Sequence, residues 1–280
     1  MMRPFAGRYI AGETLDEELD KLAELGAQGY SGILDILGEN VTSEGEARQV
    51  MAAYSAAAKK LKEHGLNAYV SVKPTHFGLT VSTDLAFELY DELAQTCADL
   101  DLFMRVEMED HPTTDATIEI FERLRKRHDN VGLVLQARLF RTPDDIDKLA
   151  PGPLHIRMVK GIYLEPSEIA YTGVDEIRRA FIECAERLFD RGAFVSLATH
   201  DDVMSVELDR VLAAKQIGTE RYEYQVLLGV REPLWQLWRD AGHPVRVYAP
   251  YGPEWRAYSL RRLGKNPELL RAIISNTFKK

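Results

Sequence analysis

Two adjacent arginines stand beside a tyrosine near the C-terminal end of the chain. Tyr258 lies three residues before Arg261 and four before Arg262. On a helix, side chains at these spacings reach the same region. Guanidinium groups bind a carboxylate through a rigid fork, and a tyrosine ring packs against apolar carbons. The pattern suits a small planar anion with an apolar body, such as an amino acid with an apolar ring. For an Arg-Arg pair alone, a solvated helix would be the simpler explanation.

Polar side chains also end a series of short apolar runs. In chain order they are Lys73, Glu107, Gln136, Arg157 with Lys160 and Gly161, Thr199 with His200, Gln225, and Tyr248. Lys73 and Glu107 would be near neighbours, where an ion pair could hold the amine or carboxylate of a substrate. A structural salt bridge explains the same two residues equally well, because structural networks also perturb ionisable groups.

Cationic groups near the middle of the chain suit an anion or an electron-rich ring. Arg157 and Lys160 could stabilise a reduced, anionic flavin, and Gly161 would let the backbone approach a ligand closely. Gln136 carries both a donor and an acceptor, which suits the edge of a heterocycle. The alternatives are an interior charge neutralised by nearby carboxylates and a core glutamine bonded to backbone.

The sequence lacks the residue patterns of a metal site and of a Ser-His-Asp catalytic triad. His200 and Asp201 have no second histidine or cysteine at ligand spacing nearby, so they make a weak metal site. No Gly-x-Ser-x-Gly elbow is present for a nucleophilic serine. The sequence therefore predicts neither a metal centre nor acyl transfer.

Regularly alternating strands and helices must position these groups. Apolar runs that predict strands cover residues 32–37, 68–72, 102–106, 132–135, 154–159, 193–197, 222–226 and 245–248. Helical patterns lie before and between them at 15–25, 44–63, 84–98, 114–127, 142–149, 174–191, 203–215 and 231–241. We expect helix caps at Thr14, Ser43, Thr83, Thr114 and Thr142. Eight such units predict an α/β fold, a (β/α)8 TIM-type barrel whose catalytic groups sit at the C-terminal strand ends.

Composition narrows the class of protein further. The chain has 280 residues, 45% of them hydrophobic, and a net charge of −9, so one large domain is expected and nucleic acid is an unfavourable partner. Cys97 and Cys184 give no disulfide framework and are expected to be buried, which fits a reducing cytoplasm. The sequence contains neither an apolar run long enough to span a bilayer nor a secretory signal.

At these residues the sequence resembles the proline dehydrogenase family. The stretches that carry the resemblance are 72–79 (VKPTHFGL), 105–110 (RVEMED), 134–137 (VLQA), 156–161 (IRMVKG), 198–201 (ATHD), 222–225 (YEYQ) and 246–262 (RVYAPYGPEWRAYSLRR). They run in order over nearly the whole chain, and together they are highly specific. The resemblance is to the single-function bacterial form, so we expect residues 1–280 to form one domain without a fused aldehyde dehydrogenase.

The resemblance implies an activity, a cofactor and partners. The family uses FAD on a distorted (β/α)8 barrel to oxidise L-proline to Δ1-pyrroline-5-carboxylate, and it passes electrons to a membrane quinone. We therefore expect a cytoplasmic flavoprotein of proline catabolism, with peripheral contact to the inner face of the membrane. A hydroxyproline or other cyclic amino acid dehydrogenase is the alternative activity. A barrel that binds an amino acid without chemistry is the alternative class, and the oligomeric state stays open.

The resemblance also implies roles for individual residues. Arg261, Arg262 and Lys73 would bind the substrate carboxylate, and Tyr248, Tyr258 and Leu227 would enclose the proline ring. The expected flavin contacts are Met108, Gln136, Arg157, Lys160, Gly161, Ile162, Thr199, His200 and Gln225. We expect Glu107 and Arg157 to act in catalysis and the last helix to lie over the pocket. Glu107 departs from the aspartate usual in relatives, and only about one helix precedes the first strand, where relatives carry more.

Overall fold

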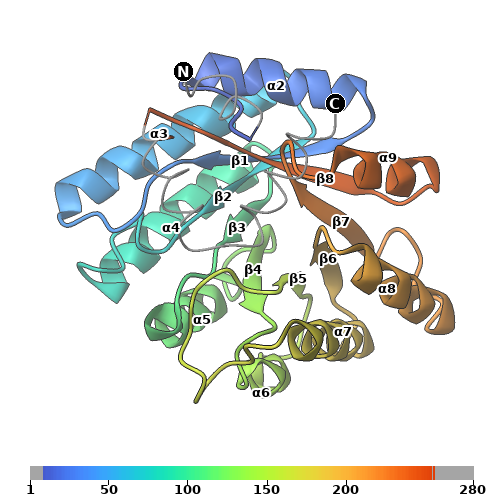
Figure 1. Ribbon diagram of the computed structural model, residues 1–280. Helices are drawn as coiled ribbons and strands as arrows, with labels where there is room; N and C mark the ends of the chain where they lie inside the picture. Colours follow the sequence, from blue (N-terminus) through green and yellow to red (C-terminus); the bar gives the residue numbers. More distant parts are fainter. Residues whose placement is uncertain (1–8, 254, 256–280) are drawn as a thin grey trace.

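Eight parallel strands close into a barrel that a ring of helices surrounds (Figure 1). The structure is a computed structural model that describes residues 9–253 and residue 255. The strands are β1 (Ser31–Ile36), β2 (Ala68–Val72), β3 (Met104–Val106), β4 (Val131–Gln136), β5 (His155–Val159), β6 (Phe194–Ala198), β7 (Tyr222–Leu227) and β8 (Val245–Tyr251). Each strand pairs with its neighbours in sequence, and β8 closes the barrel against β1. The predicted (β/α)8 architecture is thus confirmed.

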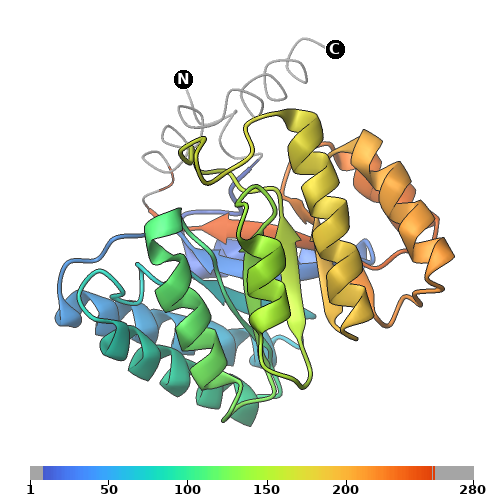
Figure 2. The same ribbon diagram turned by 90° about the horizontal axis from the view of Figure 1, so that it is seen from below.

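Helices alternate with the strands and cover the outside of the barrel (Figure 2). They are α2 (Leu15–Ala27), α3 (Glu44–Glu63), α4 (Thr83–Asp99), α5 (Thr114–Leu124), α6 (Thr142–Lys148), α7 (Val174–Asp190), α8 (Asp202–Ala214) and α9 (Glu232–Asp240), with a 3-10 turn η1 (His111–Thr113) before α5. Each of the longer helices buries one apolar stripe against the sheet, as Leu19, Leu22 and Leu25 do in α2. The expected lid helix lies outside the described residues.

Two of the predicted helix caps are confirmed and three are wrong. Thr14 forms a capping box with Glu17, and the Ser43 hydroxyl accepts a hydrogen bond from the backbone of Glu46. The cap of α4 is Ser82 instead of Thr83, because the serine hydroxyl is the one that reaches the free N–H groups of the first turn. Thr114 and Thr142 are the first residues of α5 and α6.

Strand β8 extends further than the sequence indicated. Its last residues, Pro250 and Tyr251, pair in register with Asp35 and Ile36 of β1. The Pro250 carbonyl accepts a hydrogen bond from the backbone of Ala11 at 2.9 Å. The proline therefore lies within the strand, whereas the apolar run predicted a strand that ends at residue 248. This extension holds the top of β1 and β8 together beside the polar groups discussed below.

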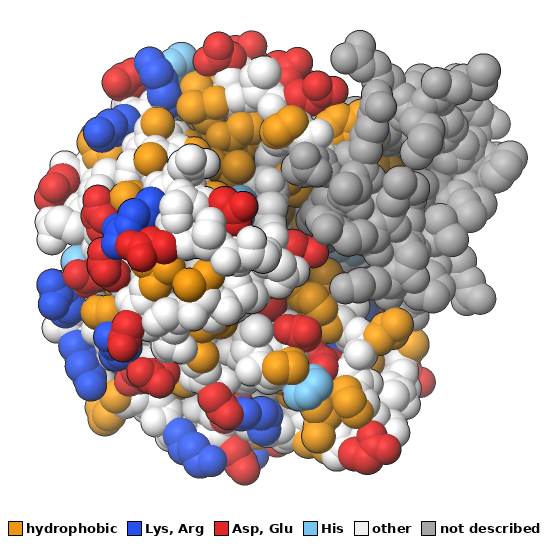
Figure 3. Space-filling model, turned by 90° about the vertical axis from the view of Figure 1, so that its left-hand side faces the viewer, with side chains coloured by type: hydrophobic (Ala, Val, Ile, Leu, Met, Phe, Trp, Pro, Cys, Tyr) orange, Lys and Arg blue, Asp and Glu red, His pale blue; other side chains and the backbone are white. Residues whose placement is uncertain are grey.

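One face of the molecule shows how the charged side chains are distributed. Figure 3 shows acidic and basic side chains interspersed over one face, without a continuous basic area. Both cysteines are buried, as expected. Within residues 9–253 and residue 255, no helix has the length and apolar content needed to cross a membrane.

Candidate active site

A buried guanidinium lies at the centre of the barrel. Arg157 of β5 is 3% exposed, and its Nη1 donates to Glu107 Oε1 at 2.5 Å. Its Nε donates to Gln225 Oε1 at 2.5 Å, and its Nη2 lies 3.3 Å from the Tyr69 hydroxyl and 3.4 Å from Ser71 Oγ. These partners come from β2, β7 and the residue after β3. Inward-facing side chains of separate strands therefore converge on one cation.

The partners of Arg157 fix the charge states at this point. Burial alone would lower the pKa of Arg157, but the Glu107 carboxylate beside it raises that pKa above its ordinary value. Burial alone would raise the pKa of Glu107, yet Arg157 and the Ser71 hydroxyl hold it below the usual range. A charged guanidinium is thus paired with a charged carboxylate inside the barrel. Glu107 is a firmly ionised partner, which makes it a weak proton acceptor.

Lys73 has a different partner from the one that we expected. Its Nζ donates to the two carboxylate oxygens of Asp35 at 3.0 and 3.1 Å. Glu107 is near enough for the Lys73 charge to lower its pKa, but the ion pair of Glu107 is with Arg157. The predicted Lys73–Glu107 pair is therefore wrong. The group that contacts Glu107 is the Arg157 guanidinium, whose Nη1 lies 2.5 Å from Glu107 Oε1.

Asp35 is the residue that sequence reasoning missed. It stands in the middle of the apolar run that forms β1, and its side chain is fully buried. The Tyr54 hydroxyl lies 3.3 Å from Asp35 Oδ1, and Tyr248 forms a further hydrogen bond to the carboxylate. A carboxylate within an apolar strand is itself an available signal, because a charge is buried only when it is paired.

The rim of the barrel at β4 and β5 holds a polar atom without a partner. Gln136 Nε2 donates to the Glu109 carbonyl at 2.7 Å, while Gln136 Oε1 is buried and accepts no hydrogen bond. Gly161 follows β5 with φ +98°, and a Cβ there would lie 2.8 Å from Gln136 Oε1. A ligand with a donor edge fits this place, since a buried carbonyl oxygen without a donor is costly.

Lys160 takes part in a second cluster of charges beside this rim. Its Nζ and the Arg178 side chain of α7 both pair with the Asp201 carboxylate. Burial alone would raise the pKa of Asp201, but hydrogen bonds from Arg178 and Lys160 hold it below its ordinary value. Asp201 also caps α8 by accepting from two backbone N–H groups. Arg178 also pairs with Asp175 at 2.9 Å, so the two cations of the cluster face two carboxylates.

His200 connects the loop after β6 to the end of β7. The backbone N–H of Leu227 donates to His200 Nε2 at 2.8 Å. An accepting Nε2 requires that any proton of the neutral ring sits on Nδ1. The Thr199 hydroxyl is buried and accepts from the backbone of Asp201 at 3.0 Å. His200, which we assigned to the flavin, is thus tied directly to Leu227, which we assigned to the substrate.

The remaining predicted residues fall into two groups. Met108 is buried after β3, Ile162 is 46% exposed after Gly161, and the Tyr248 ring lies with its centroid 5.3 Å from the Arg157 guanidinium carbon. Gln225 uses its amide to contact Arg157, the Tyr69 hydroxyl and Glu223. Tyr258, Arg261 and Arg262 lie outside the described residues. The structure brings most of the predicted set to the C-terminal ends of the strands.

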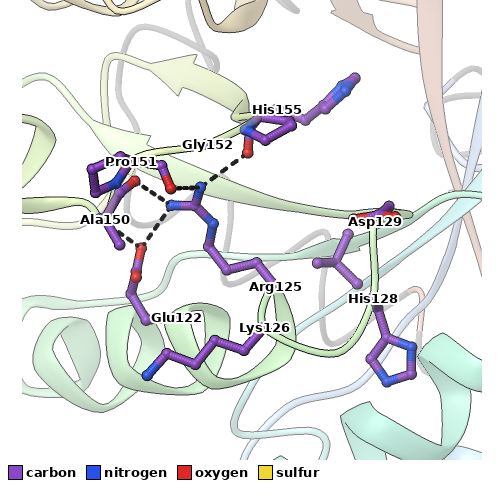
Figure 4. A pocket seen from close by; sticks show the side chains of 11 residues that line it. Glu122, Arg125, Lys126, His128, Asp129, Ala150, Pro151, Gly152 and His155 are labelled. Atoms are coloured by element: carbon purple, nitrogen blue, oxygen red, sulfur yellow. Dashed lines mark hydrogen bonds and ion pairs between the residues drawn. The ribbon is translucent and has the colours of Figure 1, made fainter.

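A surface pocket at the opposite end of the barrel has a structural explanation. It is lined by residues around the starts of β4 and β5, among them Arg125 and His155 (Figure 4). Arg125 donates to the backbone carbonyls of Ala150, Pro151 and Pro153 at 2.8, 3.3 and 3.1 Å. Its guanidinium is thus occupied in holding the loop before β5. Barrel enzymes carry their chemistry at the other end.

No three histidine, cysteine or acidic side chains gather into a metal-binding group in the described part of the chain. The side chains of His200 and Asp201 have different partners. Asp201 pairs with Lys160 and Arg178, and His200 accepts a hydrogen bond from a backbone amide. The site is therefore built from ion pairs and amide groups, which suit an organic ligand.

Comparison with known proteins gives one consistent family. The profile of a family described as proline dehydrogenase matches residues 18–270. The chain is 32% identical over 266 residues to proline dehydrogenase 2 of Bacillus subtilis, which covers 95% of this chain and 88% of that protein. It is 30% identical to the proline dehydrogenase of Deinococcus radiodurans, over 98% of this chain and 90% of that protein.

Solved structures agree in fold. Proline utilization A (PutA) from Bdellovibrio bacteriovorus superposes with a TM-score of 0.84 at 24% identity over 93% of this chain. The match spans 32% of that longer protein, so this chain corresponds to about a third of it. The similarity at this identity concerns the barrel alone.

Proposed function

The chain belongs to the proline dehydrogenase family and oxidises proline to Δ1-pyrroline-5-carboxylate with a flavin; we propose that the flavin is FAD and that the electrons pass to a quinone. The observation that carries the proposal is the barrel mouth. There the Lys73–Asp35 and Arg157–Glu107 ion pairs lie buried beside an amide oxygen, Gln136 Oε1, that lacks a donor.

The residues around Gln136 fit a flavin. Its free carbonyl oxygen would accept from the pyrimidine edge, and Gly161 leaves the space beside that oxygen open. Arg157 would lie next to the ring, and Lys160 would offset the negative charge of the cofactor. We assign further contacts to Met108, Ile162, Thr199, His200 and Gln225. A flavin held by these residues would supply the redox chemistry, as the acceptor of a hydride from C5 of proline.

The protein contributes position and charge to the reaction. Lys73 is proposed to bind the proline carboxylate together with Arg261 and Arg262, which orients C5. Tyr248, Tyr258 and Leu227 are proposed to enclose the ring and exclude water. The Arg157 guanidinium, held in place by Glu107, places a fixed positive charge where electron density accumulates. Both residues are thereby assigned to catalysis.

We further propose that residues 1–280 form one domain that works in the cytoplasm. The quinone acceptor is membrane-bound in this proposal, so the protein would contact the inner face of the membrane peripherally. Neither feature is needed for the oxidation of proline itself.

The proposal is tested by the absorption spectrum of the purified protein without oxygen. We expect a yellow protein whose flavin absorption is bleached by L-proline and much less by 4-hydroxyproline, because Tyr248 leaves little room for a hydroxyl. Extraction and chromatography of the released cofactor distinguish FAD from FMN. A protein that stays colourless with excess FAD, or whose flavin is not reduced by proline, contradicts the proposal.

A further inference from the structure

The Lys73–Asp35 ion pair is complementary in charge to an amino acid zwitterion. The Lys73 ammonium and the Asp35 carboxylate lie 3.0 Å apart in the barrel mouth. Proline carries its ammonium and its carboxylate on one carbon atom, so its two charges are also close neighbours. A zwitterion placed against this pair meets an opposite charge for each of its own groups.

We infer that Asp35 binds the proline ammonium while Lys73 binds the carboxylate, and that Asp35 then accepts the amine proton. This inference rests on the proposed function. One N–H bond of the ammonium breaks, and the proton adds to the Asp35 carboxylate. The neutral amine keeps its electron pair, a hydride leaves C5 for the flavin, and the product departs as the protonated imine. Atoms and charges balance without any other reactant.

The surroundings of Asp35 suit a proton acceptor. Burial raises the pKa of Asp35, the Lys73 ammonium lowers it, and the Glu107 carboxylate raises it. The hydroxyls of Tyr54 and Tyr248 face the same carboxylate from α3 and β8. When a substrate carboxylate draws the Lys73 ammonium to itself, the main influence that keeps Asp35 ionised weakens. Substrate binding therefore strengthens the base.

A second buried carboxyl belongs to the same region. Glu18 of α2 is fully buried, and neither of its oxygens has a hydrogen-bond partner. Burial and the nearby Asp35 charge raise the pKa of Glu18 well above its ordinary value, so it holds its proton. The negative charge of the two groups therefore resides on Asp35, the one that faces the barrel mouth.

Glu107 is the obvious alternative base, and its contacts argue against it. Its Oε1 is bound to the Arg157 guanidinium and to the Ser71 hydroxyl, both at 2.5 Å. Protonating this carboxylate would leave a buried guanidinium without a counter-charge, which is costly. Among the described residues, Asp35 pairs with the Lys73 ammonium and not with a guanidinium, and this ammonium is the group that the substrate carboxylate would engage.

Two ligands that differ by one ammonium group test the inference. Cyclopentanecarboxylate lacks the amine, and 1-aminocyclopentane-1-carboxylate has it but carries no hydrogen on the carbon next to nitrogen, so neither can be oxidised like proline. We expect Asp35→Asn to weaken binding of the amino ligand by roughly 10- to 100-fold, measured by calorimetry of the holoprotein. The amine-free ligand should bind equally well or more tightly, because Asp35 no longer competes with the ligand carboxylate for Lys73.

Controls separate a binding role from a structural one. Asp35→Asn removes a carboxylate that pairs with Lys73. The double variant Asp35→Asn/Lys73→Met is therefore measured as well, and it should no longer distinguish the two ligands by their ammonium group. Equal weakening of both ligands by Asp35→Asn, or a preserved preference for the amino ligand in the double variant, overturns the inference. For proline itself, Asp35→Asn should shift the rise of kcat/KM to higher pH, and an unchanged profile also overturns it.

Failure of the proposed function remains distinguishable from failure of this inference. A wild-type holoprotein whose flavin is not reduced by proline contradicts the function. The comparison of the two cyclopentane ligands reads the Asp35 contact separately, because it requires no turnover.

Discussion

The Arg157 guanidinium and the Glu107 carboxylate form an ion pair inside the barrel, with Nη1 and Oε1 2.5 Å apart. Both side chains are almost fully removed from solvent. Because each charge has lost its hydration, the two depend on each other more strongly than surface charges do. The pair also has a geometric role, since it holds Arg157 at one position below the mouth.

Removal of one partner should therefore destabilise the protein. Glu107→Ala leaves Arg157 buried without a counter-charge, and we expect the free energy of unfolding to fall by about 3–5 kcal/mol. The matched control is Glu119→Ala, which removes an exposed carboxylate 3.4 Å from Arg123 and should cost less than about 1 kcal/mol. Urea denaturation measures both. Equal effects of the two substitutions would contradict the assigned role of burial.

The arginine pair near the C-terminus gives a prediction about catalysis. Arg262→Ala should reduce kcat/KM for proline by on the order of 10²–10³, because charge-assisted bonds to a buried carboxylate are strong. The position lies outside the described residues, so the expectation rests on the sequence pattern and the family. Arg210→Ala, which removes an exposed arginine of α8, is the control and should leave kcat/KM unchanged. A near-normal kcat/KM in Arg262→Ala would remove the carboxylate assignment.

The fold was predictable because the strands and helices leave local signals. The run at 68–72 and the helix at 44–63 match the structure residue for residue, since burial and periodicity coincide there. Helix ends that depend on a side-chain hydrogen bond were harder to predict. Ser82 and Thr83 are neighbouring hydroxyl residues that look alike in sequence, and only the backbone geometry decides which one caps the helix. The last residues of β8, among them Pro250, were not predicted as strand because their pairing with β1 depends on residues far away in the sequence.

The site was predictable as a set of residues, but its pairings were not. Strand ends gave Lys73, Glu107, Arg157 and Gln136, and the barrel brings them to one mouth. Which carboxylate pairs with which cation depends on side chains that cross the interior, and no spacing along the chain encodes that. Asp35 escaped notice because it is one charged residue within an apolar run, where the surrounding pattern indicated only a strand.

Gly161 permits a direct test of the proposed flavin site. Gly161→Ala should cost about 1–3 kcal/mol of stability, since φ is +98° and the new methyl group would lie 2.8 Å from Gln136 Oε1. It should also lower the amount of flavin that copurifies, because that oxygen is the proposed acceptor. The control is Gly26→Ala in α2, where nothing lies within 4 Å of the new Cβ. We expect that substitution to be neutral or stabilising by up to about 1 kcal/mol.

Flavin content and stability separate two explanations of the Gly161 result. A variant that loses stability but binds flavin in full would show that the glycine serves the backbone alone. A variant that loses neither would show that residue 161 tolerates a side chain, and the fit of a flavin beside Gln136 would lose its main support.

Glu18 predicts an unusual dependence of stability on pH. Burial raises its pKa well above the usual value, so the folded protein keeps the proton while the unfolded chain releases it above about pH 4.3. Below that pH both states are protonated and the group costs nothing through ionisation. As the pH rises further, the unfolded state is favoured by about 1.4 kcal/mol for each unit up to the folded pKa.

Glu18→Gln should therefore stabilise the protein near pH 7 and have little effect near about pH 4. Glutamine has the shape of the protonated acid but no proton to lose, so the substitution removes the slope and keeps the packing. Glu24→Gln, an exposed position of the same helix, is the control and should change the free energy of unfolding by less than about 1 kcal/mol, because exposed ion pairs contribute little. Urea denaturation at the two pH values measures the difference. If Glu18→Gln has the same effect at both, the buried carboxyl does not carry the proton that its surroundings require.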